Sequence, residues 1–264
     1  MFFHQPHNTI GNNVFNACVY RSFFYDTHIH KGYEFTFVLE GTLSAKVDDT
    51  EYLLTSGEAL LLFPYQLHSY QADKSCLCLT VVFSDSFIPS FANIVKDKKP
   101  LSAKVFPSAE TQAFIKKNFL TKPTYPVSTT IKTPDELPLK ACLYALCDDF
   151  LKQNELVASP EKDSLITAII LYVEKNFQKN ITLRDMAKDL GYCHEHLSRV
   201  FNKTFHINFK TFVNQYRLEF ASHLIKTTKK TFLEISMESG FQSIRSFNRT
   251  FLTLANVNPS SLRK

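Results

Sequence analysis

The stretch HIHKGYEFTFVLEG, residues 28–41, contains side chains that can bind a metal ion or hydrogen-bond a ligand. His28 and His30 are two residues apart, and Glu34 follows four residues after His30. Alternate side chains of a β-strand share one face, so a strand here would place all three on the same face. His68, in LLLFPYQLHSY, could reach them from a neighbouring strand. Three imidazoles and one carboxylate would suit a divalent transition metal.

A metal-free pocket is the alternative interpretation of these side chains. Histidines that line a polar cavity can hydrogen-bond an organic ligand or each other. The sequence favours this alternative, a small-molecule pocket without a metal or other cofactor. A guanidinium can hold a ligand carboxylate, so Arg21 is a further candidate. The expected ligand-binding residues are therefore Arg21, His28, His30, Glu34 and His68.

Short strands are expected to position these side chains. Across residues 14–83, short apolar or alternating runs such as EFTFVLEG, SAKVDD, EYLLTSG, EALLLFP and CLCLTVVF are separated by turn signals. This pattern predicts an all-β sandwich or barrel. Asp48 and Asp49 would form a hairpin turn, and Gly41 and Gly57 lie where the chain must reverse.

Two helices and a linker are expected after the barrel. Residues 108–121 have apolar side chains at helical spacing, with Ser108 as the N-cap. Residues 137–154 carry a clearer apolar stripe, which would pack on the barrel or on a partner helix. Residues 155–163, ELVASPEKD, are small and charged and contain a proline, which is typical of a linker.

Charge is distributed unevenly along the chain. Residues 1–161 contain 14 Lys and Arg against 17 Asp and Glu, whereas residues 162–264 contain 16 against 8. The basic second part suggests a polyanionic partner. The six cysteines form no C-x-x-C pair and are expected to be buried free thiols in a reducing cytoplasm. We expect neither a signal peptide nor a membrane span.

The basic part contains one element written twice. TLRDMAKDLGYCHEHLSRVFNKTF, residues 182–205, matches TFLEISMESGFQSIRSFNRTFLTL, residues 231–254. Each copy predicts a helix-turn-helix: a capping box at Thr182 or Thr231, a first helix ended by Gly191 or Gly240, and a second helix. An amphipathic helix over residues 209–226 would join the copies. In such motifs the second helix enters the DNA major groove.

This half resembles the DNA-binding domain of the AraC/XylS family of transcription regulators. The resemblance covers residues 162–264 and is carried by LSRVFNKTF, EISMESGFQSIRSFNRTF and VNPSSLR. The first half is similar to the sensor and dimerisation domain common in that family. Its H-x-H-x3-E-x6-G spacing resembles the first motif of the cupin superfamily, and Gly57 to His68 resembles the second motif without its glycine.

The resemblance implies which side chains face DNA. In the first recognition helix they are Glu195, Ser198 and Arg199, and in the second they are Ile244, Arg245, Ser246, Asn248 and Arg249. Lys203, Arg217, Lys229 and Lys230 are candidates for phosphate contacts. Cys193 stands where the family has a capping serine, so the first recognition helix should begin less firmly. His206 and Asn256 replace glycines and should adopt left-handed conformations.

The expected fold is therefore a two-domain chain, with an all-β cupin-like barrel and appended helices followed by an all-α domain of two helix-turn-helix units. Its expected parts are an arm and barrel (1–107), a helical segment for possible dimerisation (108–154), a linker (155–163) and the DNA-binding domain (164–264). The resemblance implies a cytoplasmic, homodimeric regulator that binds promoter DNA and a small-molecule effector, and activates through RNA polymerase. The alternatives are a metal-dependent cupin enzyme with an appended DNA-binding domain, and a ligand-independent regulator.

Overall fold

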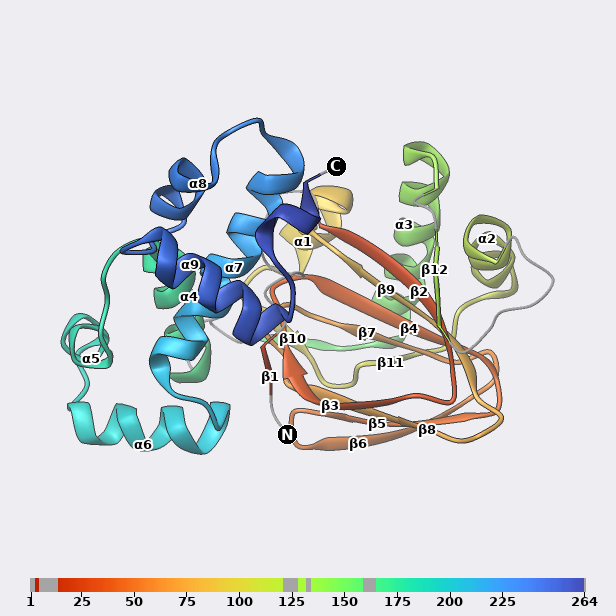
Figure 1. The fold of residues 1–264 in the computed structure, drawn as a ribbon. Coiled ribbons are helices and arrows are strands. Elements are labelled where there is room, and N and C mark those ends of the chain that lie inside the picture. The colour runs from red at the N-terminus through yellow and green to blue at the C-terminus, as the bar shows by residue number, and fades with distance from the viewer. Residues whose placement is uncertain (1–2, 5–13, 121–127, 132–133, 159–164, 264) are drawn as a thin grey trace. The chain divides into compact units, whose positions relative to one another are not determined.

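The computed structural model describes residues 3–4, 14–120, 128–131, 134–158 and 165–263. The chain divides into two compact units, Met1–Glu161 and Lys162–Lys264. The first unit contains two large sheets and several helices, and the second is helical (Figure 1). This confirms the expected two-domain fold class. Among the described residues, no helix combines the length and the apolar character that a membrane crossing requires.

Two sheets form the first unit, and all their pairings are antiparallel except that between β1 and β3. The six-stranded sheet has the order β11 (Lys104–Val105), β7 (Ala59–Leu62), β4 (Tyr33–Glu40), β9 (Leu77–Phe83), β2 (Phe15–Arg21) and β12 (Ser128–Thr130). The five-stranded sheet has the order β1 (Phe3–His4), β3 (Phe24–Ile29), β8 (His68–Ala72), β5 (Thr42–Val47) and β6 (Thr50–Thr55). A separate small sheet pairs β10 (Lys98–Pro100) with β13 (Leu156–Ala158).

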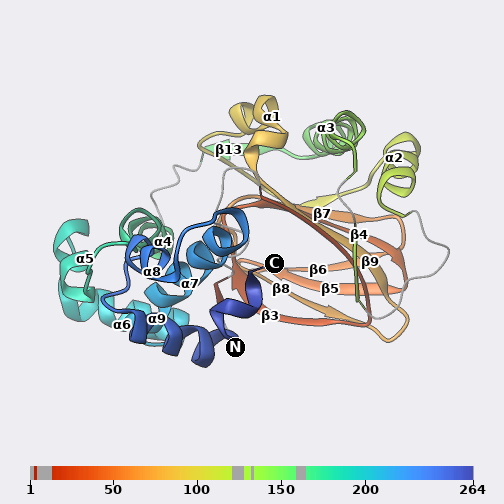
Figure 2. The ribbon, with the colours of Figure 1, turned by 45° about the horizontal axis from the view of Figure 1, so that its top comes forward.

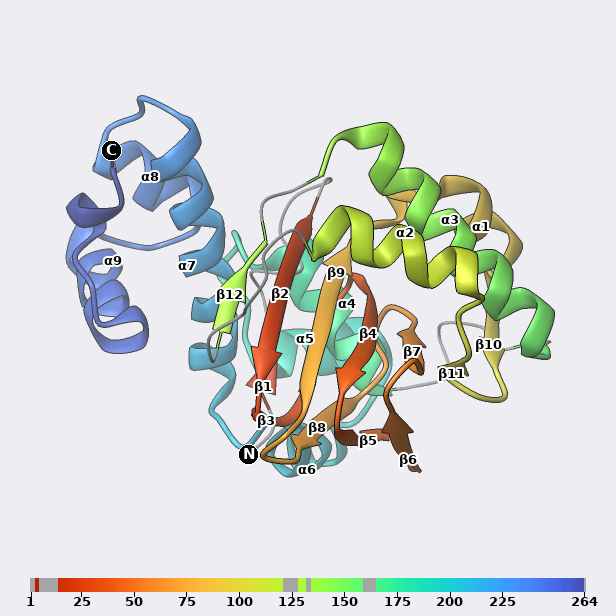
Figure 3. The ribbon, with the colours of Figure 1, turned by 90° about the vertical axis from the view of Figure 1, so that its right-hand side faces the viewer.

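The six-stranded sheet is covered on both faces. Helices α1 (Pro89–Ile94), α2 (Ala109–Phe119) and α3 (Glu136–Gln153) lie on one face, and the five-stranded sheet lies on the other (Figures 2 and 3). Along β4, Phe35 and Phe37 join the core beneath the helices, whereas Val38 joins the core between the sheets. Burial on both faces explains why β7 and β9 are almost continuously apolar. It also directs Glu34 and Thr36, which alternate with Phe35 and Phe37, between the sheets.

The local predictions in this unit agree with the structure. Asp48 has a φ of 51° in the two-residue turn between β5 and β6. Ser108 caps α2 by accepting from the Thr111 backbone N–H. The apolar stripe of α3 packs in the core of its own unit. The predicted linker, residues 155–163, falls partly outside the described residues, but its beginning forms the strand β13.

The second unit contains two helix pairs with α7 (Phe209–Thr227) between them (Figures 1 and 3). The first pair is α5 (Leu183–Leu190) with α6 (His194–Phe205), and the second is α8 (Phe232–Glu238) with α9 (Ile244–Thr250). A π-turn (Phe251–Ala255) and a 3₁₀ turn (Pro259–Leu262) follow. Helix α4 (Leu165–Asn176), which was not predicted from the sequence, packs against α5 and α6.

Candidate functional site

His28, His30, Glu34 and His68 converge into a group that we call the histidine cluster. Each residue is 2% exposed, and one ligand atom from each lies within 4.8 Å of the others. They do not share one strand, as the sequence suggested: the chain turns after His30, so that His28 belongs to β3 and Glu34 to β4. His68 lies on β8, directly opposite His28 in the ladder between β3 and β8.

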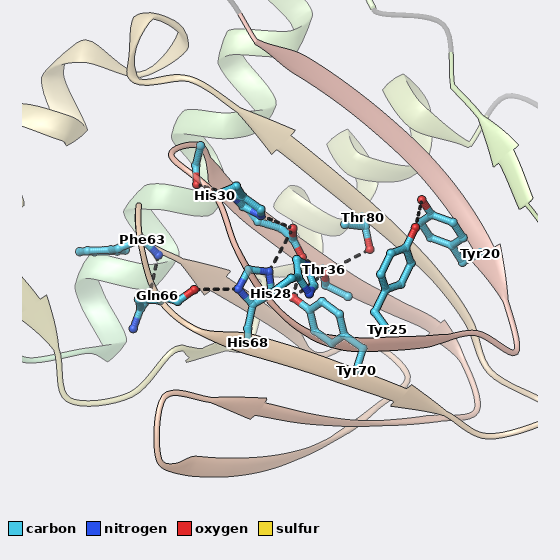
Figure 4. A network of polar contacts seen from close by, with 12 residues as sticks. Tyr20, Tyr25, His28, His30, Thr36, Phe63, Gln66, His68, Tyr70 and Thr80 are labelled. Atoms are coloured by element: carbon cyan, nitrogen blue, oxygen red, sulfur yellow. Dashed lines mark hydrogen bonds and ion pairs between the residues drawn. The ribbon is translucent and has the colours of Figure 1, made fainter. Parts of the chain in front are cut away.

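Backbone carbonyls hold the Nδ1 atom of every histidine in the cluster, and Figure 4 shows the contact between His68 and Gln66. His28 Nδ1 lies 2.9 Å from the Asp26 carbonyl oxygen. His30 Nδ1 lies 3.1 Å from that of Gly32, and His68 Nδ1 lies 2.9 Å from that of Gln66. A carbonyl oxygen only accepts hydrogen bonds, so Nδ1 is the protonated nitrogen in each ring. The Nε2 atoms are therefore left to interact within the cluster.

Glu34 is held by hydroxyl groups on one of its two oxygens. The Tyr70 hydroxyl donates to Glu34 Oε1 at 2.6 Å, and the Thr36 hydroxyl donates to the same oxygen at 3.2 Å. The other oxygen, Oε2, lies 3.0 Å from His30 Nε2 and 3.6 Å from His68 Nε2. The carboxylate is thus oriented with Oε2 toward the imidazoles.

Burial and mutual charge set the protonation of these groups. Burial lowers the pKa of His28 to about 2 and also lowers the pKa of His30. Burial alone would raise the pKa of Glu34, but the neighbouring His68 and His30 outweigh it and hold that pKa well below its ordinary value. Burial, reinforced by the charge of Glu34, raises the pKa of Tyr70, so its hydroxyl remains a donor.

The remaining candidate residue of the first unit, Arg21, is placed differently from the prediction. Arg21 is not part of the cluster; it pairs at 3.5 Å with Glu40, and the two side chains are 39% and 60% exposed. Tyr70 and Thr36, which orient Glu34, were not among the residues predicted from the sequence. Gln66 was given no role either, although its side chain accepts from the Phe63 backbone N–H. Alternation along β4 and β8 could have indicated Thr36 and Tyr70, since they lie two residues from Glu34 and His68.

The first recognition helix, α6, presents a mixed polar face. Leu197, Phe201 and Phe205 are buried, so they fix which side of α6 faces inward. Glu195, Arg199 and Lys203 are exposed, and Ser198 is half-buried. Phe201 and Phe205 both contact the Phe212 ring of α7, with centroid distances of 5.5 and 4.5 Å.

The second recognition helix, α9, presents a more basic face. Phe247 is buried, and the exposed residues are Ile244, Arg245, Asn248 and Arg249. Ser246 is half-buried, and its hydroxyl donates to the Ser243 carbonyl at 2.8 Å. Its backbone N–H donates to the Ser243 hydroxyl, so that Ser246 takes part in the N-cap as well as in the predicted DNA-facing set.

The capping predictions for both copies are confirmed. Thr182 with Asp185, and Thr231 with Glu234, form reciprocal capping boxes. Gly191 and Gly240 have φ values of 74° and 84°, and Cys193 makes no side-chain cap bond. His206 and Asn256 are left-handed, with φ values of 52° and 54°.

The prediction that Arg217 contacts phosphate is wrong. The residue is only 9% exposed, and its Nε and Nη2 atoms donate to the carbonyls of Phe177 and Lys179 at 2.7 and 2.8 Å. A guanidinium used in this way supports the fold and is not presented to DNA. Lys203, Lys229 and Lys230 are exposed; Lys230 Nζ also pairs with Glu238 at 2.5 Å.

The segment 177–179, which we call the junction, precedes the first copy in the chain and contacts the second copy and α7. Gln178 donates to the Glu238 carbonyl at 2.9 Å, immediately before the turn of the second copy. Gly240 packs so closely on Gln178 that an added Cβ would lie 2.5 Å from the Gln178 carbonyl oxygen. The Arg217 guanidinium also lies 5.9 Å from the centre of the Phe241 ring. The second copy is therefore held against the junction, the segment that precedes the first copy.

Comparison with known families gives two matches. Residues 15–170 match the AraC-like ligand binding domain, and residues 186–264 match a helix-turn-helix domain. The HTH-type transcriptional regulator YfiF of Bacillus subtilis is 25% identical over 247 residues, which is 89% of this chain and 78% of YfiF. An HTH-type regulator of Staphylococcus aureus is 29% identical over 101 residues, which is 38% of this chain and only 14% of that regulator.

Solved structures of ToxT from Vibrio cholerae share the fold. One has a TM-score of 0.51 and 17% identity, and the match covers 95% of this chain and 97% of ToxT. Another, with an unsaturated fatty acid bound, has a TM-score of 0.50 and 16% identity over 94% of each chain. The likeness supports a sheet-rich first domain followed by a helical second domain.

Proposed function

Because the chain belongs to the AraC family, we propose that α6 and α9 read promoter DNA and that a small effector bound between the sheets controls this reading. The chain is an AraC-family transcriptional regulator with a ligand-binding domain. The residues that contact DNA, the effector site and the partners are parts of the proposal.

Two exposed arginines at matching places carry the proposal. Arg199 of α6 and Arg249 of α9 follow the buried Leu197 and Phe247 by two residues in each copy. A guanidinium can bind guanine through two hydrogen bonds in the major groove. Glu195 and Ser198 accompany Arg199, while Ile244, Arg245, Ser246 and Asn248 accompany Arg249. We assign Lys203, Lys229 and Lys230 to the phosphate backbone, and we withdraw Arg217 because it is buried.

Selection from random DNA with the full-length protein tests this function. The selected sequences should contain two half-sites about one helical turn apart. Affinity for the selected DNA should exceed that for random DNA by at least about 10³-fold and should fall steeply with salt, because several phosphates are neutralised. Equal affinity for selected and random DNA, or a flat salt dependence, would contradict the proposal.

The proposal extends to the way in which the regulator acts. We propose that it is a homodimer in the cytoplasm, where the DNA lies, that it activates transcription through RNA polymerase, and that it is not an enzyme. Sedimentation at micromolar concentration tests the dimer, and transcription with purified polymerase tests activation. The ToxT precedent of a bound fatty acid suggests an acidic effector, but the buried carboxylate of Glu34 would repel a carboxylate placed beside it.

A further inference from the structure

Two cysteine side chains outside the histidine cluster lie next to each other in the core between the sheets. Cys78 belongs to β9, and Cys76 directly precedes that strand. Both are fully buried in the same core, as expected for residues two apart on a strand, which share one face. Their sulfur atoms are close enough to form a hydrogen bond with each other. We call Cys76 and Cys78 the thiol pair.

The two thiols of the pair are not equivalent. The hydrogen bond from Cys78 lowers the pKa of Cys76, and the positive charge of Arg21 acts in the same direction and outweighs burial and the charge of Asp73. Burial raises the pKa of Cys78 well above its ordinary value, and its hydrogen bond to Cys76 reinforces the effect. Cys76 is therefore the sulfur that loses its proton first. The thiolate, rather than the thiol, is the form that binds a metal ion.

The position of the pair on a strand does not favour a disulfide. Residues two apart on a strand have Cα atoms about 6.8 Å apart, which is the upper limit for a disulfide bond. Their side chains also point in parallel directions rather than toward each other, and both cysteines are free. An ion that accepts a lone pair from each sulfur would bridge the pair without bringing the two sulfur atoms into bonding contact.

The number and type of ligands select the ion. Among the described residues, only the histidine cluster gathers three or more His, Cys, Asp or Glu side chains around one point, so the thiol pair offers two sulfur ligands. Zn²⁺ in protein sites takes four ligands. Cu⁺ is a soft ion that thiolates select, and it is stable between two sulfur atoms. The rings of Tyr20, Phe23 and Tyr25 pack against the same core, which disfavours water as a further ligand.

We propose that the thiol pair binds one Cu⁺ ion through the sulfur atoms of Cys76 and Cys78. Each thiol releases its proton to solvent, so the ion with its two thiolates carries one net negative charge. Arg21, whose charge already acts on Cys76, offsets this charge. Residues 73–75, which directly precede Cys76, are exposed, so the pair lies close to the surface of the unit. Binding is argued from the pair itself, whereas the role of the ion as effector rests on the proposed function.

Anaerobic titration of the reduced, metal-free, full-length protein with Cu⁺, in competition with a coloured Cu⁺ chelator, tests the proposal. We expect one Cu⁺ per chain and an ultraviolet charge-transfer band from thiolate to copper. The X-ray absorption spectrum of the bound copper should show two sulfur neighbours, and excess Zn²⁺ should leave the ion in place. Nitrogen neighbours would assign the ion to imidazoles and would overturn the proposal.

Substitutions separate the thiol pair from the other candidate ligands. Cys76→Ser and Cys78→Ser each remove one of two ligands and should weaken Cu⁺ binding by at least about 100-fold. Arg21→Gln should weaken it by only about 3-fold, because Arg21 is partly exposed. Cys193→Ser, at the exposed cysteine, and His68→Gln, in the histidine cluster, should bind Cu⁺ like the wild type. Thermal unfolding of each metal-free variant verifies that it is folded.

The outcomes separate this proposal from the proposed function. A wild type that loses all Cu⁺ to the chelator, or Cu⁺ binding that survives in both Cys76→Ser and Cys78→Ser, would overturn the site. DNA affinity is measured on the same samples by fluorescence anisotropy, with and without Cu⁺. Specific DNA binding without Cu⁺ binding would leave the proposed function intact, whereas Cu⁺ binding without specific DNA binding would contradict only that function. Equal DNA affinity with and without Cu⁺ would overturn the role of the ion as effector.

Discussion

The two helix-turn-helix copies share one pattern but are held by different contacts. In the first copy an added Cβ on Gly191 would meet nothing within 4 Å, whereas in the second it would strike the backbone of Gln178. The N-cap of α6 is Cys193, which makes no cap bond, whereas α9 is capped by the Ser243 hydroxyl. The comparison teaches that a repeat in sequence does not imply equal tertiary contacts at the turn and the cap, and from these contacts we expect the second copy to be fixed more firmly than the first.

Alanine substitutions of Gly191 and Gly240 should give the largest difference in stability between the two copies. Ala at either position pays the strain of a left-handed backbone, about 1–2 kcal/mol. Gly240→Ala must also displace the junction, which adds about 1–3 kcal/mol of overpacking. We therefore expect Gly240→Ala to destabilise the protein by about 2–5 kcal/mol and Gly191→Ala by about 1–2 kcal/mol, as measured by urea denaturation. Equal losses would remove the proposed difference in rigidity.

Arg217 tests whether the junction belongs to the fold or to the DNA interface. Arg217→Leu would leave the partly buried carbonyls of Phe177 and Lys179 without their donors, so we expect a loss of about 2–4 kcal/mol in the free energy of unfolding. Lys175→Ala, an exposed basic residue on α4, is the control and should change stability by less than about 0.5 kcal/mol. Unchanged unfolding with weaker DNA binding would restore Arg217 as a phosphate contact.

Substitutions of Arg199 and Arg249 test how much each copy contributes to the free energy of DNA binding. Arg249→Ala should cost about 1–3 kcal/mol of binding free energy and relax the preference at one base pair. Arg199→Ala should cost less, because α6 begins without a side-chain cap and carries Glu195 in its first turn. Anisotropy titrations against selected DNA and its single-base variants measure both effects. A larger loss for Arg199→Ala would reverse the ranking of the copies.

The N-caps should give the smallest effects, with opposite signs. Ser243→Ala removes a cap and should destabilise the protein by about 1 kcal/mol. Cys193→Ser supplies the missing hydroxyl and should stabilise it by about 0.5–1 kcal/mol. Thermal denaturation in reducing buffer measures both. A destabilising Cys193→Ser would show that the thiol has a packing role.

Most of the fold could be predicted because it follows from local chemistry. The features that could not be predicted depend on contacts between residues far apart in the sequence. The repeat and the capping boxes at Thr182 and Thr231 could be identified from residue types alone, whereas the left-handed His206 was predicted from the family resemblance. The burial of Arg217 could not, because its partners lie in a segment about 40 residues away. The convergence of the histidine cluster was predicted, but the strands that carry its residues were not. The turn after His30 places Glu34 on β4, whereas the sequence suggested one strand for His28, His30 and Glu34.

Helix α7 has a consequence for the helical phase of the target. Because α7 contacts α6 through the Phe212 ring and also packs against α9, we expect the protein to dictate the angular offset between the two half-sites. Inserting about 5 base pairs, half a turn of B-form duplex, would move one half-site to the opposite side of the double helix. Two loosely tethered readers could follow it, whereas a pair held together through α7 would have to twist the DNA or release one half-site.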